Sequence, residues 1–252
     1  MNRAMLLLID GLRADAARAN MCFMTLLESR GLATFKVIRT VSPPVSKNVY
    51  ATLATGLDPL AHGILDNDRS PAGETPTIFS RARDAGLAVA AAAHIWFAEI
   101  CGARDAALPA SRFRYDPLAP ISYGLFYSSD SYPDQELFAD AEVLRELCEP
   151  DLMLTHSMGV DWAGHRTGGE SREYADAVRR ADALLSRYLP VWMAAGYQIL
   201  IMSDHGMNAD GAHYDNSGGT NLVPVWGIGE AWTTLPDSPA DVAPMLGAIL
   251  GV

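Results

Sequence analysis

The sequence predicts an α/β protein: a compact three-layer sandwich with a mostly parallel central sheet and only a minimal cap insertion. Two observations lead to this fold class. Short apolar runs that stop at Gly, Asp or Ser alternate along the chain with segments of helical periodicity. The 252 residues, of which 49% are hydrophobic, also suffice for one sizeable core. We therefore expect a single domain over residues 1–252.

Six strands are expected from apolar runs that end at polar or turn-forming residues. They cover residues 5–9, 33–39, 87–93, 152–156, 197–202 and 222–228. The first run is too short for a membrane span and stops at Asp10-Gly11, which is typical of a buried strand followed by a turn. The Ala-rich run at 87–93 fits a strand, although it is compatible with a helix. Residues 95–133, rich in aromatic residues, Pro and Ser, are expected to form a small irregular insertion over the site.

Six helices are expected from apolar periodicity and from end signals. They cover residues 12–30, 46–53, 77–85, 134–148, 171–195 and 241–250. Gly31 and Gly86 mark two helix ends, and Pro44 before and Gly56 after delimit the second helix. Pro190 is expected to bend or break the long helix.

Charge and cysteine content narrow the functional class. The formal net charge of −11 argues against a nucleic-acid binder, which needs a basic face. It is compatible with a small phosphorylated substrate, because bound cations invert the local field. The three cysteines are far apart and form no C-x-x-C pair, which favours reduced thiols in a cytoplasmic protein. We expect no nucleic-acid or membrane partner, and a homodimer is left open.

Four polar residues stand where predicted strands end or soon after: Asp10, Asp161, Asp204 and His205. Asp10 directly follows the first strand, and Asp204-His205 follow the strand at 197–202. Asp161 and His165 are four residues apart, so a helical turn would place them on one face. Ligands of open α/β sheets collect outside the carboxyl ends of the strands, so these residues can converge. Taken singly, each has a plainer explanation, such as a helix N-cap, an Asx turn or a surface pair.

His213 follows eight residues after His205 in a loop rich in Gly, Asp and Asn. A lone loop histidine is usually only solvated. Here it supplies the nitrogen that a three-residue site with Asp161 and His165 would otherwise lack. Carboxylate and imidazole donors suit zinc and also manganese.

In chain order, these motifs resemble the alkaline phosphatase superfamily and, within it, the nucleotide pyrophosphatase/phosphodiesterase type. The order is Asp10-Gly11, a nucleophile segment running into Ala54-Thr55-Gly56-Leu57, His62-Gly63-Ile64, D-x-x-G-H from Asp161 to His165, S-D-H-G-M from Ser203, and His213. The resemblance covers roughly residues 5–65 and 150–228. It implies two divalent metal ions, zinc in most of the family and manganese in some branches.

The resemblance also assigns the ligands. It implies that one metal is held by Asp161, His165 and His213. The other is implied to be held by Asp10, Asp204, His205 and the oxygen of the nucleophile.

Ser46 is the expected nucleophile. The family carries its nucleophile nine residues before the Thr of the Thr-Gly pair, and counting back from Thr55 gives Ser46. A serine at a helix start also lies beside unpaired N–H groups that favour a phosphate, although such a serine is often only an N-cap. Ser42 and Thr52 are the alternatives.

The residues after Ser46 depart from the family pattern. The phosphodiesterase branch usually has Asn three residues after the nucleophile, where this chain has Val49. We therefore expect Asn48 or Lys47 to bind the substrate's phosphoryl oxygen. The sulfatase branch is disfavoured, since its C/S-x-P-S-R motif is absent here.

The expected activity is hydrolysis of phosphodiesters or phosphomonoesters in two steps, through a phosphoserine on Ser46. One alternative keeps the site and changes the substrate to a phosphonate, as in phosphonoacetate hydrolase; related phosphomutases are a further option. The other alternative is a non-catalytic module that binds metal or phosphate, which the completeness of the motif set disfavours.

Overall fold

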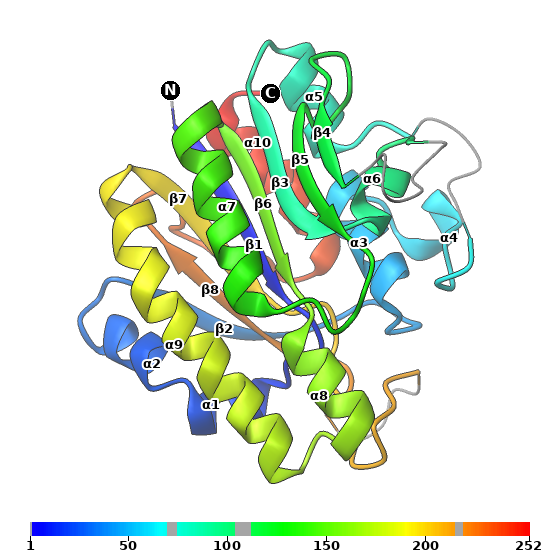
Figure 1. The fold of residues 1–252 in the computed structure, drawn as a ribbon, viewed down its shortest axis with the longest axis vertical. Helices are drawn as coiled ribbons and strands as arrows, with labels where there is room; N and C mark the ends of the chain where they lie inside the picture. Colours follow the sequence, from blue (N-terminus) through cyan, green and yellow to red (C-terminus); the bar gives the residue numbers. More distant parts are fainter. Residues whose placement is uncertain (1, 70–74, 104–111, 215–218) are drawn as a thin grey trace.

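In the computed structural model, which describes residues 2–69, 75–103, 112–214 and 219–252, one sheet forms the centre of the molecule (Figure 1). The strands are β1 (Arg3–Ile9), β2 (Thr34–Arg39), β3 (Val89–His94), β4 (Phe113–Tyr115), β5 (Tyr123–Tyr127), β6 (Leu152–Ser157), β7 (Tyr197–Met202) and β8 (Leu222–Ile228). Their order in the sheet is β2-β8-β7-β1-β6-β3-β5-β4. The predicted α/β fold with a mostly parallel sheet is confirmed.

Helices cover both faces of this sheet. They are α1 (Ala14–Asn20), α2 (Cys22–Ser29), α3 (Ser46–Thr55), α4 (Pro59–His62), α5 (Ile78–Asp84), α6 (Trp96–Ile100), α7 (Asp134–Cys148), α8 (Gly159–Thr167), α9 (Arg172–Ala194) and α10 (Val242–Leu250), with a 3-10 turn η1 (Pro239–Asp241). In Figure 1, α7, α9 and α2 lie in front of the sheet, and α10 lies behind it.

The alternation of side chains along β1 explains why two helical layers are needed. Leu6 and Leu8 pack into the core that contains α3, α5 and α10, whereas Leu7 and Ile9 pack into the core on the α7 and α9 side. Successive side chains of a strand point to opposite faces of the sheet. A strand that is apolar on both faces, as β1 is, must therefore be covered on both.

Strand direction gathers the polar residues at one edge. β1 runs parallel to both β6 and β7, and β3 runs parallel to β6 and β5. The strands β2, β4 and β8 pair antiparallel at the margins. The carboxyl ends of five adjacent strands thus meet at one edge of the sheet, where an open α/β fold binds its ligands.

Three regions differ from the expectations. Residues 95–133, expected to be irregular, supply α6, β4 and β5, so their described part belongs to the central sheet; residues 104–111 lie outside the described part. The helix expected at 12–30 is two helices, because Met21 leaves the helical conformation with φ −98° and ψ 78°. The helix α9 continues through Pro190.

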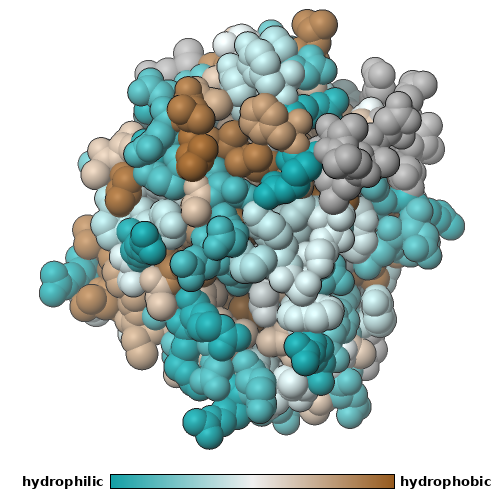
Figure 2. Space-filling model, in the orientation of Figure 1, coloured by the Kyte–Doolittle hydropathy of each residue, from teal (hydrophilic) through white to brown (hydrophobic). Residues whose placement is uncertain are grey.

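The surface shown in Figure 2 is mixed, with hydrophilic side chains over its lower part and apolar patches nearer the top. Within the described part of the chain, no helix combines the length and the apolar character needed to cross a membrane.

Candidate metal centre

The predicted ligands converge at the carboxyl edge of the sheet. Asp10 follows β1 and Asp204 follows β7 within two residues. α8 begins shortly after β6 and carries Asp161 and His165, so the four-residue spacing does place both on one helix. The loop after β7 brings His213 back over the same edge, where its ring stacks on that of His205 with centroids 3.6 Å apart.

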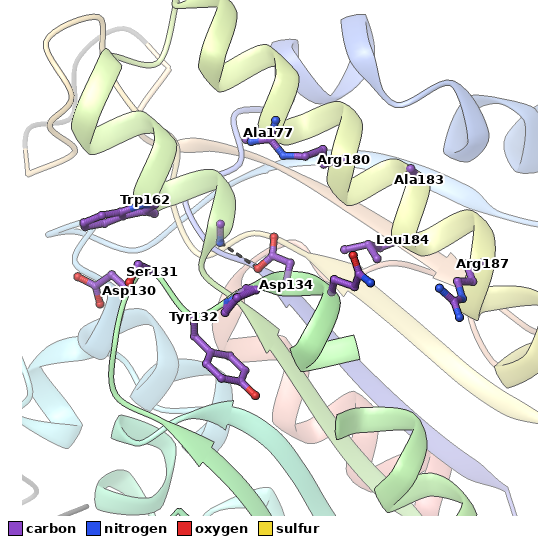
Figure 3. A pocket seen from close by; sticks show the side chains of 13 residues that line it. Asp130, Ser131, Tyr132, Asp134, Trp162, Ala177, Arg180, Ala183, Leu184 and Arg187 are labelled. Atoms are coloured by element: carbon purple, nitrogen blue, oxygen red, sulfur yellow. Dashed lines mark hydrogen bonds between the residues drawn. The ribbon is translucent and has the colours of Figure 1, made fainter. Parts of the chain in front are cut away.

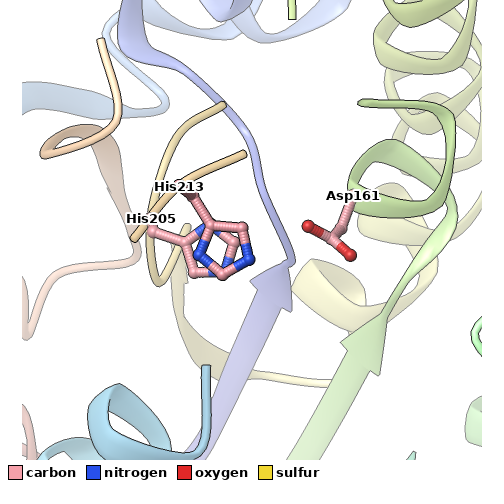
Figure 4. Close-up of side chains that lie close together, drawn as sticks. All are labelled: Asp161, His205 and His213. Carbon is pink, nitrogen blue, oxygen red and sulfur yellow. The ribbon is translucent and has the colours of Figure 1, made fainter. Parts of the chain in front are cut away.

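Two clusters of donor atoms result, and His205 belongs to both. The first contains Asp161, His205 and His213, and the second contains Asp10, Asp204 and His205; within each cluster the donor atoms lie within 4.8 Å of one another. Figure 4 shows Asp161 facing the two stacked imidazole rings across a gap.

His165 stands beside the first cluster rather than inside it. Its Nε2 lies 3.4 Å from Asp161 Oδ2, and its ring centre is 5.1 Å from that of His213. The expected grouping placed His165 with Asp161 and His213, and left His205 to the second metal. The structure brings all six side chains together but places the shared imidazole of His205 between the two clusters.

The three histidines share one orientation that suits metal binding. In each ring, Nδ1 lies within hydrogen-bonding distance of a backbone carbonyl: Gly211 for His165 at 2.8 Å, Gly206 for His205 at 2.9 Å, and Pro44 for His213 at 2.7 Å. A carbonyl can only accept, so Nδ1 carries the proton and donates it. Nε2 is then left with a free lone pair, as a metal ligand requires.

The three carboxylates show the complementary feature. Asp10 Oδ1, Asp161 Oδ1 and Asp204 Oδ2 are buried and have no hydrogen-bond partner among the described residues. Burial raises the pKa of Asp10 to about 7, an effect that the hydrogen bond from Tyr50 partly offsets. Burial and the neighbouring carboxylates raise the pKa values of Asp161 and Asp204 well above the usual range. Unpaired buried carboxylates are costly, and a divalent cation removes that cost.

These observations fit two divalent cations. Three orphaned carboxylate oxygens and three imidazole nitrogens with free lone pairs face one another. This mixture of oxygen and nitrogen donors is typical of zinc sites and is also suited to manganese.

Ser46 stands at the second cluster. It is the first residue of α3, it is buried, and its Oγ lies 3.0 Å from His205 Nε2. The alternative Thr52 lies further along the same helix, where its hydroxyl donates to Asn48 O and contacts His62 Nε2. Of the two residues, Ser46 alone has its hydroxyl at a donor atom of the clusters.

The two residues after Ser46 have protein partners. The Lys47 ammonium is buried and lies 2.7 Å from Glu99 Oε2, and the amide of Asn48 donates to Pro43 O at 2.7 Å. Asn48 Oδ1 is buried without a hydrogen-bond partner among the described residues. The side chain of Val49 packs fully buried in the hydrophobic core, so position 49 does not face the site.

Three residues around Asp10 were not selected from the sequence. The Tyr50 hydroxyl donates to Asp10 Oδ2, and His156 Nε2 lies 3.1 Å from the same oxygen. The hydroxyl of Tyr127 lies 2.8 Å from His156 Nδ1. A signal existed for Tyr50 alone, because it follows Ser46 by four residues and so shares its helix face.

A groove of about 560 Å³ lies between the start of α7 and the helices α8 and α9, and none of the predicted metal ligands lines it (Figure 3). Trp162, the chain neighbour of Asp161, lies at one end together with Asp130, and α9 forms a wall with Arg180 and Arg187. Asp134 lines the middle and accepts a hydrogen bond from Gly159 N at 3.1 Å. The volume of the groove falls within the usual range for small-molecule sites.

Comparison with known proteins gives a family. Residues 4–214 match the type I phosphodiesterase / nucleotide pyrophosphatase family. A characterised relative is GPI ethanolamine phosphate transferase 2 of Candida glabrata, which is 32% identical over 76 residues. That match covers 30% of this chain and 9% of the relative, so the chain corresponds to a small part of that protein.

Solved structures give the same fold. Murine ectonucleotide pyrophosphatase/phosphodiesterase 5, solved as an inactive variant with AMP, has a TM-score of 0.65 at 18% identity, over 82% of this chain and 58% of that one. Alkaline phosphatase from the Antarctic bacterium TAB5 has a TM-score of 0.65 at 13% identity, over 100% and 99%. Phosphonoacetate hydrolase from Sinorhizobium meliloti 1021, solved with phosphonoformate, has a TM-score of 0.55 at 21% identity, over 81% and 56%.

Proposed function

We propose, from the chain's membership of the type I phosphodiesterase / nucleotide pyrophosphatase family, that it hydrolyses phosphodiesters or phosphomonoesters through a phosphoserine formed on Ser46. The observation that carries the proposal is the position of the Ser46 hydroxyl. It lies 3.0 Å from Nε2 of His205, the imidazole shared by both clusters of donor atoms. A nucleophile held at the junction of the two clusters can attack a phosphorus atom that both clusters face.

The chain's own residues have definite parts in this reaction. Ser46 Oγ forms the new bond to phosphorus, while the bond from phosphorus to the leaving oxygen breaks and that oxygen takes up a proton. Water then hydrolyses the phosphoserine and restores the hydroxyl. Because Ser46 begins α3, the positive end of the helix dipole lies beside the anionic ester.

Two divalent cations, which we propose are zinc or manganese, complete the site. Asp161 and His213 would hold one, with His165, which stands beside them, as the third ligand. Asp10, Asp204 and His205 would hold the other, with the Ser46 oxygen beside it. Bound there, the cations would lower the pKa of the attacking hydroxyl and offset charge on the transferring group. Since His205 stands in both clusters, its loss is expected to affect both cations.

The substrate is recognised on two sides in this proposal. Lys47 places a positive charge one residue from the nucleophile, although Glu99 lies 2.7 Å from its Nζ. Asn48 donates one of its two amide N–H groups to Pro43 O, and the second would be the donor to a phosphoryl oxygen. Trp162, the chain neighbour of Asp161, lines a groove that we propose receives the second ester group of a phosphodiester.

A variant of Ser46 tests this function directly. We expect Ser46→Ala to lower turnover of bis(p-nitrophenyl) phosphate at least about 1,000-fold with zinc or manganese supplied, as loss of a nucleophile typically does. Ser42→Ala is the matched control, because it removes a hydroxyl from the other serine considered as the nucleophile. Unchanged turnover by Ser46→Ala would refute the phosphoserine. A purified protein without stoichiometric divalent metal would refute the two-cation site.

A phosphonate is the second candidate substrate. The likeness to phosphonoacetate hydrolase shows the fold alone, but Val49 supplies no amide at the position where the phosphodiesterase branch usually carries Asn. A rate panel with a phosphodiester, a phosphomonoester, phosphonoacetate and a sulfate ester separates the candidates. Release of phosphate from phosphonoacetate at a rate above those of both esters would favour the phosphonate; no turnover of any of them would favour a non-catalytic binding module.

A further inference from the structure

Asp10 uses its two oxygens differently. Oδ1 has no hydrogen-bond partner among the described residues and lies 3.4 Å from His205 Nε2 in the second cluster. Oδ2 points the other way, toward the hydroxyl of Tyr50 and toward His156 Nε2 at 3.1 Å. A carboxylate with one anchored oxygen has a fixed plane, so the direction of its free oxygen is fixed as well.

The two partners of Oδ2 also contact each other, because Nε2 of His156 lies 2.7 Å from the Tyr50 hydroxyl. Phe97 packs against both rings, stacked on Tyr50 with centroids 4.6 Å apart and tilted against His156 at 5.5 Å. All these side chains are fully or almost fully buried. Water therefore cannot replace a lost contact at this place without opening the core.

Tyr127 fixes the ring of His156 from the opposite side. Its hydroxyl lies 2.8 Å from Nδ1 and 3.0 Å from the carbonyl oxygen of His156. If the ring proton were on Nδ1, the lone pair of Nε2 would face Asp10 Oδ2 at 3.1 Å. A proton on Nε2 instead points at the oxygens of Asp10 and Tyr50, while the Tyr127 hydroxyl can donate to Nδ1. This is the reverse of the three candidate ligand histidines, whose Nδ1 atoms face carbonyl oxygens.

The three residues come from separate elements. Tyr50 lies on α3, His156 on β6, and Tyr127 at the end of β5. Tyr50 is also one helical turn after Ser46, so its bond to Asp10 links the helix of the nucleophile to the strand of a metal ligand.

We infer that Tyr50 and His156 are positioning residues that hold Asp10 Oδ2, and that Tyr127 positions the ring of His156. Oδ1 alone is then presented to the cation, and the helix that carries Ser46 is held next to Asp10. The inference rests on the proposed function, since it assumes a cation at Asp10. Outer hydrogen bonds of this kind orient a ligand and typically contribute 10-fold to 100-fold in metal affinity or activity.

The test measures metal affinity as well as rate. We expect Tyr50→Phe and His156→Leu each to raise the dissociation constant of one of the two Zn²⁺ ions about 10-fold to 100-fold, in competition with a chromophoric chelator. His156→Gln should restore part of this affinity, because its amide can place an N–H where the ring has Nε2. Tyr197→Phe is the matched control: its buried hydroxyl donates to Pro150 O at 2.7 Å, at the opposite end of the sheet, and its loss should leave Zn²⁺ affinity within about twofold.

A second measurement uses the wild-type protein, so it does not depend on any variant folding. The ¹⁵N spectrum of the histidine rings in metal-free protein, with His156→Gln to identify the resonance, should show His156 protonated on Nε2. Protonation on Nδ1, or Zn²⁺ affinities of Tyr50→Phe and His156→Leu equal to that of Tyr197→Phe, would overturn the positioning role and leave the proposed function standing. A wild-type protein that binds no stoichiometric Zn²⁺ would overturn both.

Discussion

Replacement of Gly11 by alanine tests whether the close packing of Gly11 against Asp161 is needed for the two cation-binding clusters. Gly11 follows Asp10 with φ +69°, and its backbone packs on α8. A Cβ added there would lie 2.8 Å from both Cα and Cβ of Asp161 and 3.0 Å from its Oδ1. The approach falls about 0.6 Å short of the 3.4 Å at which ordinary Cβ contacts begin. Because Cα belongs to the helix backbone, no rotation of a side chain relieves it.

Two costs follow from this geometry. The left-handed backbone costs an alanine about 1–2 kcal/mol, and forcing a methyl group into a packed site costs about 1–3 kcal/mol more. Gly31→Ala separates the two, because Gly31 has nearly the same φ of +68° and an added Cβ there meets nothing within 4 Å. We expect Gly11→Ala to lower the free energy of unfolding by about 1–3 kcal/mol more than Gly31→Ala does, measured by urea denaturation of metal-free protein.

Activity should separate the two variants further. If α8 recedes, Asp161 moves with it, and a displacement approaching 1 Å at a reacting centre can cost about 100-fold in rate. We expect kcat/KM of Gly11→Ala to fall about 10-fold to 100-fold, and that of Gly31→Ala to stay within about twofold. A Gly11→Ala protein that unfolds at the same urea concentration as Gly31→Ala and retains wild-type turnover would show that the contact with Asp161 is not restrictive.

Three further outcomes are expected. Trp162→Ala should raise KM for a bis-aryl phosphodiester about 3-fold to 10-fold and leave KM for the monoester unchanged, because it shortens one wall of the groove; an equal change for both esters would contradict this. Burial raises the pKa of Asp134 from 3.8 to about 6, so the folded state retains a proton there that the unfolded chain has lost, and stability falls as pH rises through that interval. Asp134→Asn keeps the acceptor for Gly159 N and removes the titrating group, so we expect it to be more stable than wild type by about 1–2 kcal/mol at pH 8 but not at pH 4. Urea denaturation at the two pH values measures this, and an equal difference at both would contradict the raised pKa of Asp134. Removal of metal by EDTA should lower the melting temperature, and Zn²⁺ at 100 times its dissociation constant should restore about 2.7 kcal/mol of unfolding free energy for each occupied site. No recovery would argue against a cation between Asp10, Asp161 and Asp204.

The sheet was predictable because its central strands are continuous apolar runs. β1 and β7 are apolar on both faces and stop just before Asp10 and Ser203, whereas β6 begins with the apolar run 152–154 and ends with three buried polar residues. β4 was missed for the opposite reason: it is three residues long, and Phe113 and Tyr115 are exposed at the sheet margin. So short an edge strand shows neither alternation nor an apolar run.

The helix α9 shows how tertiary packing outweighs a local signal. Pro190 removes one backbone donor, which predicted a bend or a break. The residues around it, Leu189 and Trp192, are fully buried, and the ring nitrogen of Trp192 donates to Glu142 Oε2 on α7. These contacts hold the segment in place, so one missing hydrogen bond does not end the helix.

The site was predictable as a set of residues but not as an arrangement. Motif order placed Asp161, His165 and His213 near one another, and strand ends placed Asp10 beside Asp204. Spacing along the chain could not show that His205 would stack on His213 and stand in both clusters. Nor could it reveal contacts among Tyr50, Tyr127 and His156, since no periodicity relates residues on a helix and two different strands.

Gly11 explains why the first motif is Asp-Gly rather than Asp alone. Its N–H donates to Asp204 Oδ1 at 3.1 Å, its Cα side packs against Asp161, and it follows Asp10 directly. It therefore touches all three carboxylates whose remaining oxygens have no hydrogen-bond partner among the described residues. One oxygen of Asp204 accepts from Gly11 N, one of Asp10 accepts from Tyr50, and one of Asp161 lies beside His165 Nε2. The other oxygen of each carboxylate is free to bind a cation. A side chain at position 11 would separate these carboxylates, and the cation-binding clusters depend on their closeness; the glycine is thus required by the site as much as by the turn.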